Sequence, residues 1–258
     1  MASPDNSTQY ACLLNLLSSY KKEGLAVCYS GGVDSTLLMA AAQQASIQPL
    51  LAITFSTPLN TAHETALAAD IARRYCRPLQ IIELDTLQLP QVATNSRQRC
   101  YHCKKALYQA AWQAARQAGI AALADGVNAD DLTTFRPGNQ AAEELRVIHP
   151  LAEAGLSKED IRLLAHQLEL PNWQLPATPC LASRFPYHTQ LTEAELRRVE
   201  SAEQYLRQAG FSEFRLRVHG PLARLELPAA AMDRALRYRE TLLEQLRSLG
   251  YRYITLDL

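Results

Sequence analysis

The amino-acid sequence predicts an α/β protein with a parallel β-sheet and helices on both of its faces, followed by a smaller α+β domain. Up to about residue 170, short apolar runs alternate with longer segments of helical periodicity. Such alternation is typical of parallel strands joined by crossover helices. Four prolines between 170 and 186 then exclude a regular helix. Beyond them the pattern changes to helix, hairpin, helix and strand.

The elements of the sheet follow from apolar runs and from helix start signals. Five runs have the length and composition of buried strands, and all but the fourth are followed by a segment with helical periodicity. Ser157 is the expected N-cap of the last helix, and Asp160 stands three positions on, close to a capping box. The expected strands are 25–29, 49–55, 79–84, 121–126 and 146–151, and the expected helices begin at Ser35 or span 61–76, 99–119 and 157–170.

The proline-rich segment is the expected boundary between two domains, 1–175 and 176–258. In the second domain a helix capped by Thr192 and ended by Gly210 precedes a hairpin. One more helix and a final strand at the C-terminus complete it. We expect this smaller domain to bind substrate and to support oligomerisation.

Composition favours a small substrate over a polyanion. The 258 residues include 26 basic and 26 acidic side chains, so no overall positive field would hold nucleic acid against salt. The sequence begins without the basic and apolar regions of a signal peptide, and no apolar run approaches the roughly twenty residues that span a bilayer. We therefore expect a cytoplasmic protein without nucleic-acid or membrane partners.

The six cysteines are expected to be reduced thiols or ligands rather than a disulfide framework. Three of them stand among apolar residues at helix or strand spacing, where a small buried hydrophobe is the simplest interpretation. These are Cys12, Cys28 and Cys76, whereas Cys100, Cys103 and Cys180 do not fit that description.

A compact polar turn, "SGGVDS", separates the first strand from the first helix. Gly31 and Gly32 allow close approach of a ligand, the helix N-terminus favours an anion, and Ser30 and Ser35 can donate hydrogen bonds to it. A Walker A loop would need a following lysine and a Rossmann loop a third glycine, and both are missing. The turn therefore predicts a pyrophosphate site, where Asp34 would hold Mg²⁺ or a polar group of the substrate.

The turn and its position resemble the pyrophosphate loop of the N-type ATP pyrophosphatases, the PP-loop family. That resemblance implies that ATP adenylates a carboxylate or carbonyl oxygen, so that a nucleophile can displace AMP. The motif "DGVNADD" follows the fourth expected strand at the same edge of the sheet. From it Gly126 and Asp131 join the expected ATP site, although Asp131 could equally be a solvated loop acid.

Several further motifs in order resemble the LarE-type sulfur transferases. They are "RCYHCKKALY", "RPGNQAA", "HPLAEAGLSKEDIR", "PATPCLASRFPY" and "RVHGPLARLEL". The resemblance covers nearly the whole chain. It implies conversion of the carboxylates of a pyridinium-3,5-dicarboxylate mononucleotide to thiocarboxylates, during synthesis of the nickel-pincer cofactor of lactate racemase. It also implies a homo-oligomer, a hexamer.

Two arginines of the second domain are candidates for holding a phosphate. Arg215 and Arg217 alternate on an expected strand, so they share one face and could form a bidentate clamp. The resemblance implies that they hold the phosphate of the substrate, with Glu203 and Arg184 nearby. A solvated strand face with a salt bridge to Glu203 is the alternative.

The three remaining cysteines allow two sulfur-transfer mechanisms. The resemblance implies either a 4Fe-4S cluster on Cys100, Cys103 and Cys180, where an open iron presents exogenous sulfide, or sacrifice of the sulfur of Cys180 itself. Zinc is a third possibility, with His102 as the fourth ligand. Cys180 and Asp34 are the expected catalytic residues.

Two other functions compete with this interpretation. Some PP-loop enzymes that thiolate tRNA also use three cysteines and a cluster, but they need a basic surface, which the charge balance does not favour. A nucleotide-binding or assembly protein with a degenerate loop is the second alternative. Against it, every polar group expected in the loop is present.

Overall fold

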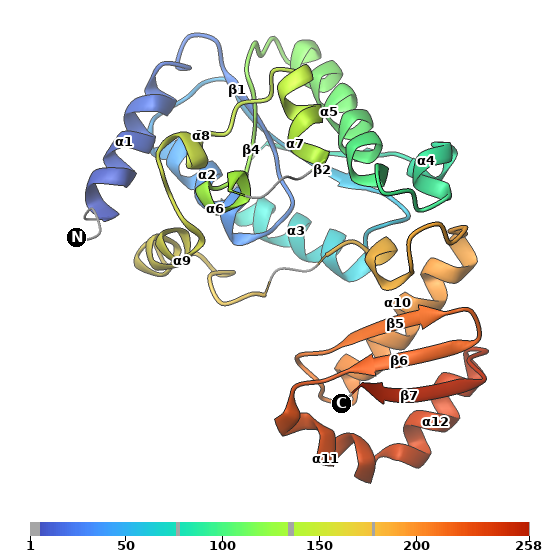
Figure 1. The fold of residues 1–258 in the computed structure, drawn as a ribbon. Helices are drawn as coiled ribbons and strands as arrows, with labels where there is room; N and C mark the ends of the chain where they lie inside the picture. Colours follow the sequence, from blue (N-terminus) through green and yellow to red (C-terminus); the bar gives the residue numbers. More distant parts are fainter. Residues whose placement is uncertain (1–5, 76–77, 134–136, 177–178, 258) are drawn as a thin grey trace. The chain divides into compact units, whose positions relative to one another are not determined.

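A computed structural model describes residues 6–75, 78–133, 137–176 and 179–257 of the chain, which forms two compact units (Figure 1). The first unit is Met1–Thr86 with Gln98–Thr178, and the second is Leu87–Arg97 with Pro179–Leu258. The domain boundary predicted at 175/176 would place 87–97 in the first domain, whereas backbone hydrogen bonds join this segment to residues 188–191.

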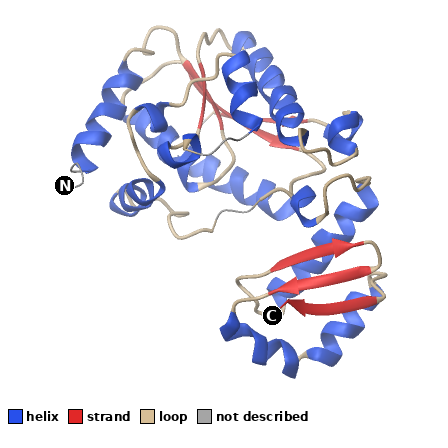
Figure 2. Cartoon of the chain, viewed as in Figure 1, coloured by secondary structure: helices blue, strands red, loops and turns tan. Residues whose placement is uncertain are grey.

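The first unit is built on a four-stranded sheet in the order β3-β2-β1-β4. Figure 2 draws its strands in red among the blue helices. All neighbouring strands are parallel, which confirms the predicted fold class. The strand order reverses between β1 and β4, and open parallel sheets bind ligands at such a point, beyond the carboxyl ends of the strands. The strands are β1 (Leu25–Cys28), β2 (Leu50–Ser56), β3 (Leu79–Glu83) and β4 (Leu123–Asp125).

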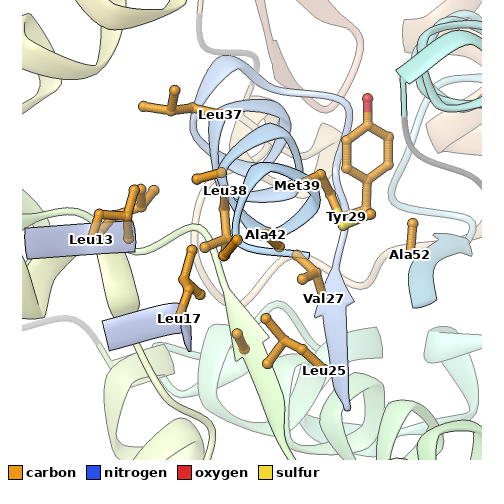
Figure 3. Packing of buried hydrophobic residues seen from close by; sticks show 14 of the residues in the cluster. Leu13, Leu17, Leu25, Val27, Tyr29, Leu37, Leu38, Met39, Ala42 and Ala52 are labelled. Carbon is orange, nitrogen blue, oxygen red and sulfur yellow. The ribbon is translucent and has the colours of Figure 1, made fainter. Parts of the chain in front are cut away.

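Helices cover both faces of the sheet, as the alternation of side chains along the strands requires. They are α1 (Asn6–Ser18), α2 (Val33–Gln44), α3 (Ala62–Tyr75), α5 (Arg99–Gln117), α6 (Ala129–Leu132), α7 (Pro137–Glu144), α8 (Pro150–Glu153) and α9 (Lys158–Gln167). Leu25 and Val27 of β1 join an apolar cluster with α1, α2, α3 and α9, whereas Ala26 joins another with α5 and α7. Figure 3 shows the first cluster, in which Leu13 and Leu17 pack beside α2.

Two expectations for the first unit are wrong. Residues 146–151 form no regular strand: Ile148 makes a single parallel bridge to Ala124, and Pro150 then begins α8. Proline at the first helical position favours a helix start and removes a donor that a longer strand would need. Helices α6 and α7 also replace much of the loop expected after β4.

The second unit packs helices on a three-stranded sheet in the order β5-β6-β7. The predicted hairpin is present as antiparallel β5 and β6, and β7 is parallel to β6. Two helices that meet at Tyr238, rather than one, precede β7. The elements are η1 (Thr86–Gln88, where the chain leaves the first unit), α4 (Pro90–Ala93), η2 (Leu181–Arg184), α10 (Glu193–Gln208), β5 (Arg215–His219), β6 (Leu222–Glu226), α11 (Ala229–Arg237), α12 (Arg239–Ser248) and β7 (Tyr253–Asp257).

Helix α10 has the predicted ends. The Thr192 hydroxyl oxygen accepts the N–H of Glu195 at 3.2 Å, and Gly210 follows the helix with a φ of +83°. No helix in the described ranges is both long and apolar enough to cross a membrane.

Candidate active site

The loop between β1 and α2 has a conformation that only glycine permits at Gly31. Its φ is +76°, and a Cβ atom added there would lie 2.6 Å from the Cβ atom of Ala68 on α3. Gly32 is the N-cap of α2, a helix of 12 residues. The loop therefore ends where backbone N–H groups and the helix dipole favour an anion.

The hydroxyl groups of the loop face one another. The Oγ atoms of Ser30 and Ser35 lie 3.3 Å apart, and Ser30 Oγ also accepts the N–H of Gly32 at 3.3 Å. These distances are at the long end for hydrogen bonds. A phosphate oxygen could replace such weak contacts, since both hydroxyls and the Gly32 N–H can donate to it.

Asp34 is held by two side chains from other elements. Its Oδ1 accepts a hydrogen bond from Nδ2 of Asn128 at 3.2 Å, and its Oδ2 forms an ion pair with Nζ of Lys158. The ammonium group offsets the repulsion that a lone carboxylate would exert on a bound phosphate.

Lys158 is a site residue that the sequence analysis missed. It is the first residue of α9, and the predicted capping box of that helix is confirmed, with Ser157 N–H donating to Asp160 Oδ2 at 2.9 Å. The backbone N–H of Lys158 donates to Asp130 Oδ2 at 2.8 Å. The cap could be recognised from sequence, but the pair with Asp34 spans 124 positions and has no local signature.

A cavity of about 540 Å³ lies beside this loop, within the size range of small-ligand sites. Gly31 and Gly32 are not in its wall. At the end of β4, a Cβ atom on Gly126 would lie 3.0 Å from the backbone nitrogen of Ser35, so the two segments touch. The residues predicted to bind ATP that line the cavity are Ser30, Asp34, Ser35, Gly126 and Asp131.

Asp131 also has a structural role. Its carboxylate accepts the N–H of Asn128 at 3.3 Å, and its own N–H donates to Asn128 Oδ1 at 3.1 Å, which forms the capping box of α6. The residue is therefore held in place in the cavity wall by the cap.

The cavity wall includes a buried carboxylate, Asp125, at the end of β4. Its oxygens accept hydrogen bonds from Tyr108 Oη at 2.5 Å, His149 Nδ1 at 2.7 Å and the N–H of Val127 at 3.0 Å, and Lys104 Nζ lies at 3.7 Å. Burial alone would raise the pKa of Asp125, but the His149 hydrogen bond and the Lys104 charge together hold it below its usual value. The carboxylate is therefore ionised at neutral pH.

The same environment makes two neighbours poor acids. Burial, and then the negative charge of Asp125, raise the pKa of both the Cys28 thiol and the Tyr108 phenol. Cys28 is thus a protonated, weakly nucleophilic thiol, although it lines the cavity and is only partly buried. Of the other two cysteines expected to be buried, Cys12 is exposed, because it lies on the outer side of α1, and Cys76 lies outside the described residues.

In the second unit, Arg184 and Glu203 form a buried ion pair. Nε and Nη2 of Arg184 donate to the two carboxylate oxygens of Glu203 at 2.8 and 3.1 Å. Nη1 of Arg184 donates to the carbonyl oxygen of Pro179 at 2.6 Å and to Ser183 Oγ at 3.0 Å. Arg184 therefore ties the turn that carries Cys180 to α10.

The two strand arginines differ in their surroundings. Arg217 donates to Glu226 Oε1 at 2.8 Å and to the carbonyl oxygen of Ser183 at 2.7 Å. The alternative of a salt bridge to Glu203 is wrong, because Arg184 occupies that carboxylate. Glu226, which pairs with Arg217 instead, lies diagonally across the hairpin, opposite Arg215. In the described part of the chain, Arg215 makes no side-chain hydrogen bond or ion pair. Both arginines lie on the sheet face opposite the buried Leu216 and Val218.

The three candidate sulfur ligands divide between the units. Cys100 and Cys103 are one turn apart on α5 in the first unit, and Cys180 precedes η2 in the second. The five described cysteines form no disulfide bond with one another. No three or more His, Cys, Asp or Glu side chains are grouped as a metal site in the described ranges. By donor chemistry, three thiols still suit an iron–sulfur cluster, which takes cysteine thiolates.

Comparison with known proteins identifies the loop. The profile of the PP-loop domain family matches residues 5–135. A pyridinium-3,5-bisthiocarboxylic acid mononucleotide synthase of Lactiplantibacillus plantarum is 36% identical over 98% of this chain and 91% of its own. An uncharacterized protein of Synechocystis is 38% identical over 90% of this chain and 87% of its own, and one of Methanocaldococcus jannaschii is 27% identical over 95% and 93%.

The matched domain and the near full-length similarity agree with the geometry of the loop and cavity. The family uses ATP, and the SGGVDS loop lies where a parallel sheet binds its ligand. The chain belongs to the PP-loop ATP pyrophosphatases and, within them, to the LarE-type ATP-dependent sulfur transferases.

Proposed function

We propose that this protein converts the carboxylates of pyridinium-3,5-dicarboxylate mononucleotide to thiocarboxylates, for the nickel-pincer cofactor of lactate racemase. The similarity to the Lactiplantibacillus plantarum synthase over 98% of the chain carries this proposal. The cavity beside the PP-loop supports it, because its volume is that of a small-ligand site and Ser30, Asp34 and Ser35 of the loop line it.

In the proposed first step, a carboxylate oxygen of the substrate attacks the α-phosphorus of ATP, giving an acyl adenylate and pyrophosphate. The loop at Ser30–Ser35 would hold the departing pyrophosphate. Mg²⁺ usually takes only one or two carboxylates from a protein, with phosphates and water completing its shell. Asp34 fits that requirement, and Lys158 beside it would stabilise the negative charge that develops on the phosphates.

A sulfur nucleophile then displaces AMP from the acyl adenylate. We propose that Cys100, Cys103 and Cys180 hold a 4Fe-4S cluster, because three thiolates match three of its four irons and two of them stand on adjacent turns of α5. When bound, the cluster would supply an iron site for exogenous sulfide. The alternative is that Cys180 gives up its own sulfur and becomes dehydroalanine.

The second unit carries the residues that we propose bind the phosphate of the substrate. Arg215 and Arg217 offer two guanidinium groups on one face of β5 for its phosphate. Arg184 and Glu203 would support that site by fixing the Cys180 turn, since their polar atoms already bond one another and the turn. We also propose a cytoplasmic homo-oligomer, a hexamer, on the resemblance to the family.

Release of AMP and pyrophosphate tests the proposal directly. Both should form from ATP in the presence of the pyridinium mononucleotide, and neither with tRNA or with no acceptor. Asp34→Ala should abolish the reaction with the fold intact, because the side chain lies at a loop end. Release that requires tRNA would instead identify a tRNA thiolase, and no release with either acceptor would indicate a nucleotide-binding protein.

A further inference from the structure

A fully buried amide, Asn172, reaches the PP-loop from a distant part of the chain. Its Nδ2 donates to the carbonyl oxygen of Gly31 at 2.8 Å and to Oγ1 of Thr36 at 2.8 Å. Both hydrogens of the amide are therefore used on the loop and on the first turn of α2. The contact with Gly31 joins residues 141 positions apart.

The orientation of the Asn172 amide follows from its partners. Gly31 offers only a carbonyl acceptor, so the amide must present NH₂ and not oxygen. Among the described residues, Oδ1 of Asn172 has no hydrogen-bond partner, although it is buried. Leaving an acceptor unsatisfied is unfavourable by about 1–3 kcal/mol. The side chain is thus arranged for the two bonds that it donates.

The segment that carries Asn172 is itself fixed. Beyond α9 the N–H of Leu170 donates to the carbonyl oxygen of Ala165 at 2.8 Å, and the Leu170 side chain is buried in the core cluster of the first unit. Trp173 packs edge-on against His166, with ring centroids 4.4 Å apart. Asn172 therefore reaches the loop from a rigid support, which positioning of another group requires.

The bond to Gly31 determines where the next backbone N–H points. A trans peptide unit is planar, so its C=O and N–H groups point in opposite directions. With the Gly31 oxygen turned toward the buried Asn172, the N–H of Gly32 turns away from the core, toward Ser30 Oγ at 3.3 Å. That N–H is one of the donors that an anion in the loop would use.

The other partner of Asn172 extends the same arrangement. Thr36 Oγ1 donates to the carbonyl oxygen of Gly32 at 3.0 Å and lies 3.2 Å from Oη of Tyr29. Asn172 and Thr36 are fully buried, and Tyr29 is nearly so. The two carbonyl oxygens of the glycine pair are therefore both directed inward by side chains.

We propose that Asn172 is a positioning residue of the nucleotide site: it holds the glycine peptides of the PP-loop with their N–H groups toward the phosphates of ATP. The inference rests on ATP use by this family. It does not depend on the acceptor substrate or on the source of sulfur. Asn172 itself contacts no ligand in this arrangement and acts through Gly31 and Thr36.

The test is the pH dependence of nucleotide binding in Asn172→Asp. At pH 8 a carboxylate would face the Gly31 oxygen without a proton to share, and we expect the Kd for ATP with Mg²⁺ to rise at least tenfold. At pH 5.5 a buried aspartate takes up a proton and can donate one bond again, so much of the affinity should return. Asn172→Leu, which never donates, should bind weakly at both pH values.

Asn95→Asp is the matched control. Asn95 is also fully buried and donates to a carbonyl oxygen, that of Pro186 at 2.8 Å, but it belongs to the second unit. Its variant should follow the pH dependence of the wild-type Kd. Titration calorimetry gives each Kd, and circular dichroism confirms the fold.

Wild-type affinity at pH 8 in folded Asn172→Asp would overturn the proposal. If that variant does not fold, a wild-type Kd at both pH values in folded Asn172→Leu, which can donate to neither Gly31 nor Thr36, would be equally decisive. Because binding of ATP alone is measured, failure of the proposed acceptor chemistry would leave these results unaffected.

Discussion

The ammonium group of Lys158 forms an ion pair with the carboxylate of Asp34, so the first residue of α9 completes the charge arrangement of the PP-loop. The two side chains are 32% and 20% exposed, which leaves the pair open to the cavity side but shielded from full hydration. An ion pair in that position can act on a ligand more strongly than one at the surface.

Lys158→Met is expected to reduce kcat/KM for AMP formation about 100-fold, the usual effect of removing one group that stabilises developing charge. Pyrophosphate release with saturating acceptor measures it. Lys105→Met is the control, because Lys105 pairs with Glu144 at 2.7 Å on the surface of the same unit and away from the cavity. Equal losses in both variants would exclude a specific role for Lys158.

Gly31→Ala should destabilise the protein and weaken ATP binding more than tenfold. The substitution forces a side chain into a φ of +76° and places its Cβ atom 2.6 Å from Ala68. Gly119→Ala separates backbone strain from steric overlap, because Gly119 has a φ of +70° but no atom within 4 Å of an added Cβ. Backbone strain alone is unfavourable by about 1–3 kcal/mol.

Urea unfolding and ATP titration should therefore show a larger stability loss for Gly31→Ala than for Gly119→Ala, and an affinity loss for Gly31→Ala only. Similar unfolding midpoints and unchanged ATP affinity in both variants would mean that the loop can move away from α3 without harm.

In Asp125→Asn the free energy of unfolding should fall less steeply than in the wild type as the pH is lowered. The folded pKa of Asp125 lies below its ordinary value, so on acidification the unfolded chain takes up this proton first and the free energy of unfolding falls. That contribution is present above the unfolded pKa, near 3.9, and is lost as pH falls through the folded pKa. Urea unfolding between pH 7 and pH 3 measures the difference.

The exposed Asp70, paired with Arg73 at 2.8 Å, supplies the comparison for this effect. Asp70→Asn removes one exposed carboxylate from the same unit and so controls for the loss of a negative charge. If the curves of Asp125→Asn and wild type run parallel below pH 5, the buried carboxylate does not control acid stability.

Arg215→Ala and Arg217→Ala should both raise the KM for the pyridinium mononucleotide more than the KM for ATP, because a charge-assisted phosphate contact is lost. Their stabilities should differ. Arg217 holds Glu226 and the Ser183 carbonyl oxygen, so its loss should also lower the unfolding midpoint, whereas Arg215 has no such partner among the described residues. Equal effects on the two KM values would place the phosphate elsewhere.

The three thiols decide how sulfur is delivered. If Cys100, Cys103 and Cys180 hold one cluster, alanine at any of them should remove the brown chromophore and repeated turnover together. If Cys180 gives up its sulfur, only Cys180→Ala should be inactive, and wild-type protein should lose about 34 Da, the mass of hydrogen sulfide. We expect no such loss in protein reconstituted with iron and sulfide under argon and supplied with excess sulfide.

Local signals predicted most of the fold. The capping residues Ser157, Asp160 and Thr192, the alternation in the hairpin and the glycine turn each act within a few positions of the chain, and the structure has them where they were expected. The prediction of a strand at 146–151 was wrong because a short apolar run suits a strand or a buried turn equally well. Pro150 begins a helix there instead.

Long-range partners could not be predicted in the same way. Lys158 and Asn172 contact the PP-loop from more than a hundred positions away in the chain. His149 contacts Asp125, although the strand that was expected to contain His149 is not formed. Nothing in the residues near each of them specifies its partner. The topology of the sheet brings them to one edge, and only that placement makes them part of the site.

The second unit is completed by a segment synthesised long before the rest of it. Asn95 donates to the carbonyl oxygens of Phe185 and Pro186, residues 90 and 91 positions later in the chain. As the chain leaves the ribosome, residues 87–97 must therefore wait while the helices and last strand of the first unit are made. A break at 178 would also separate the two parts of the second unit, so residues 179–258 produced alone would lack a piece of their own core.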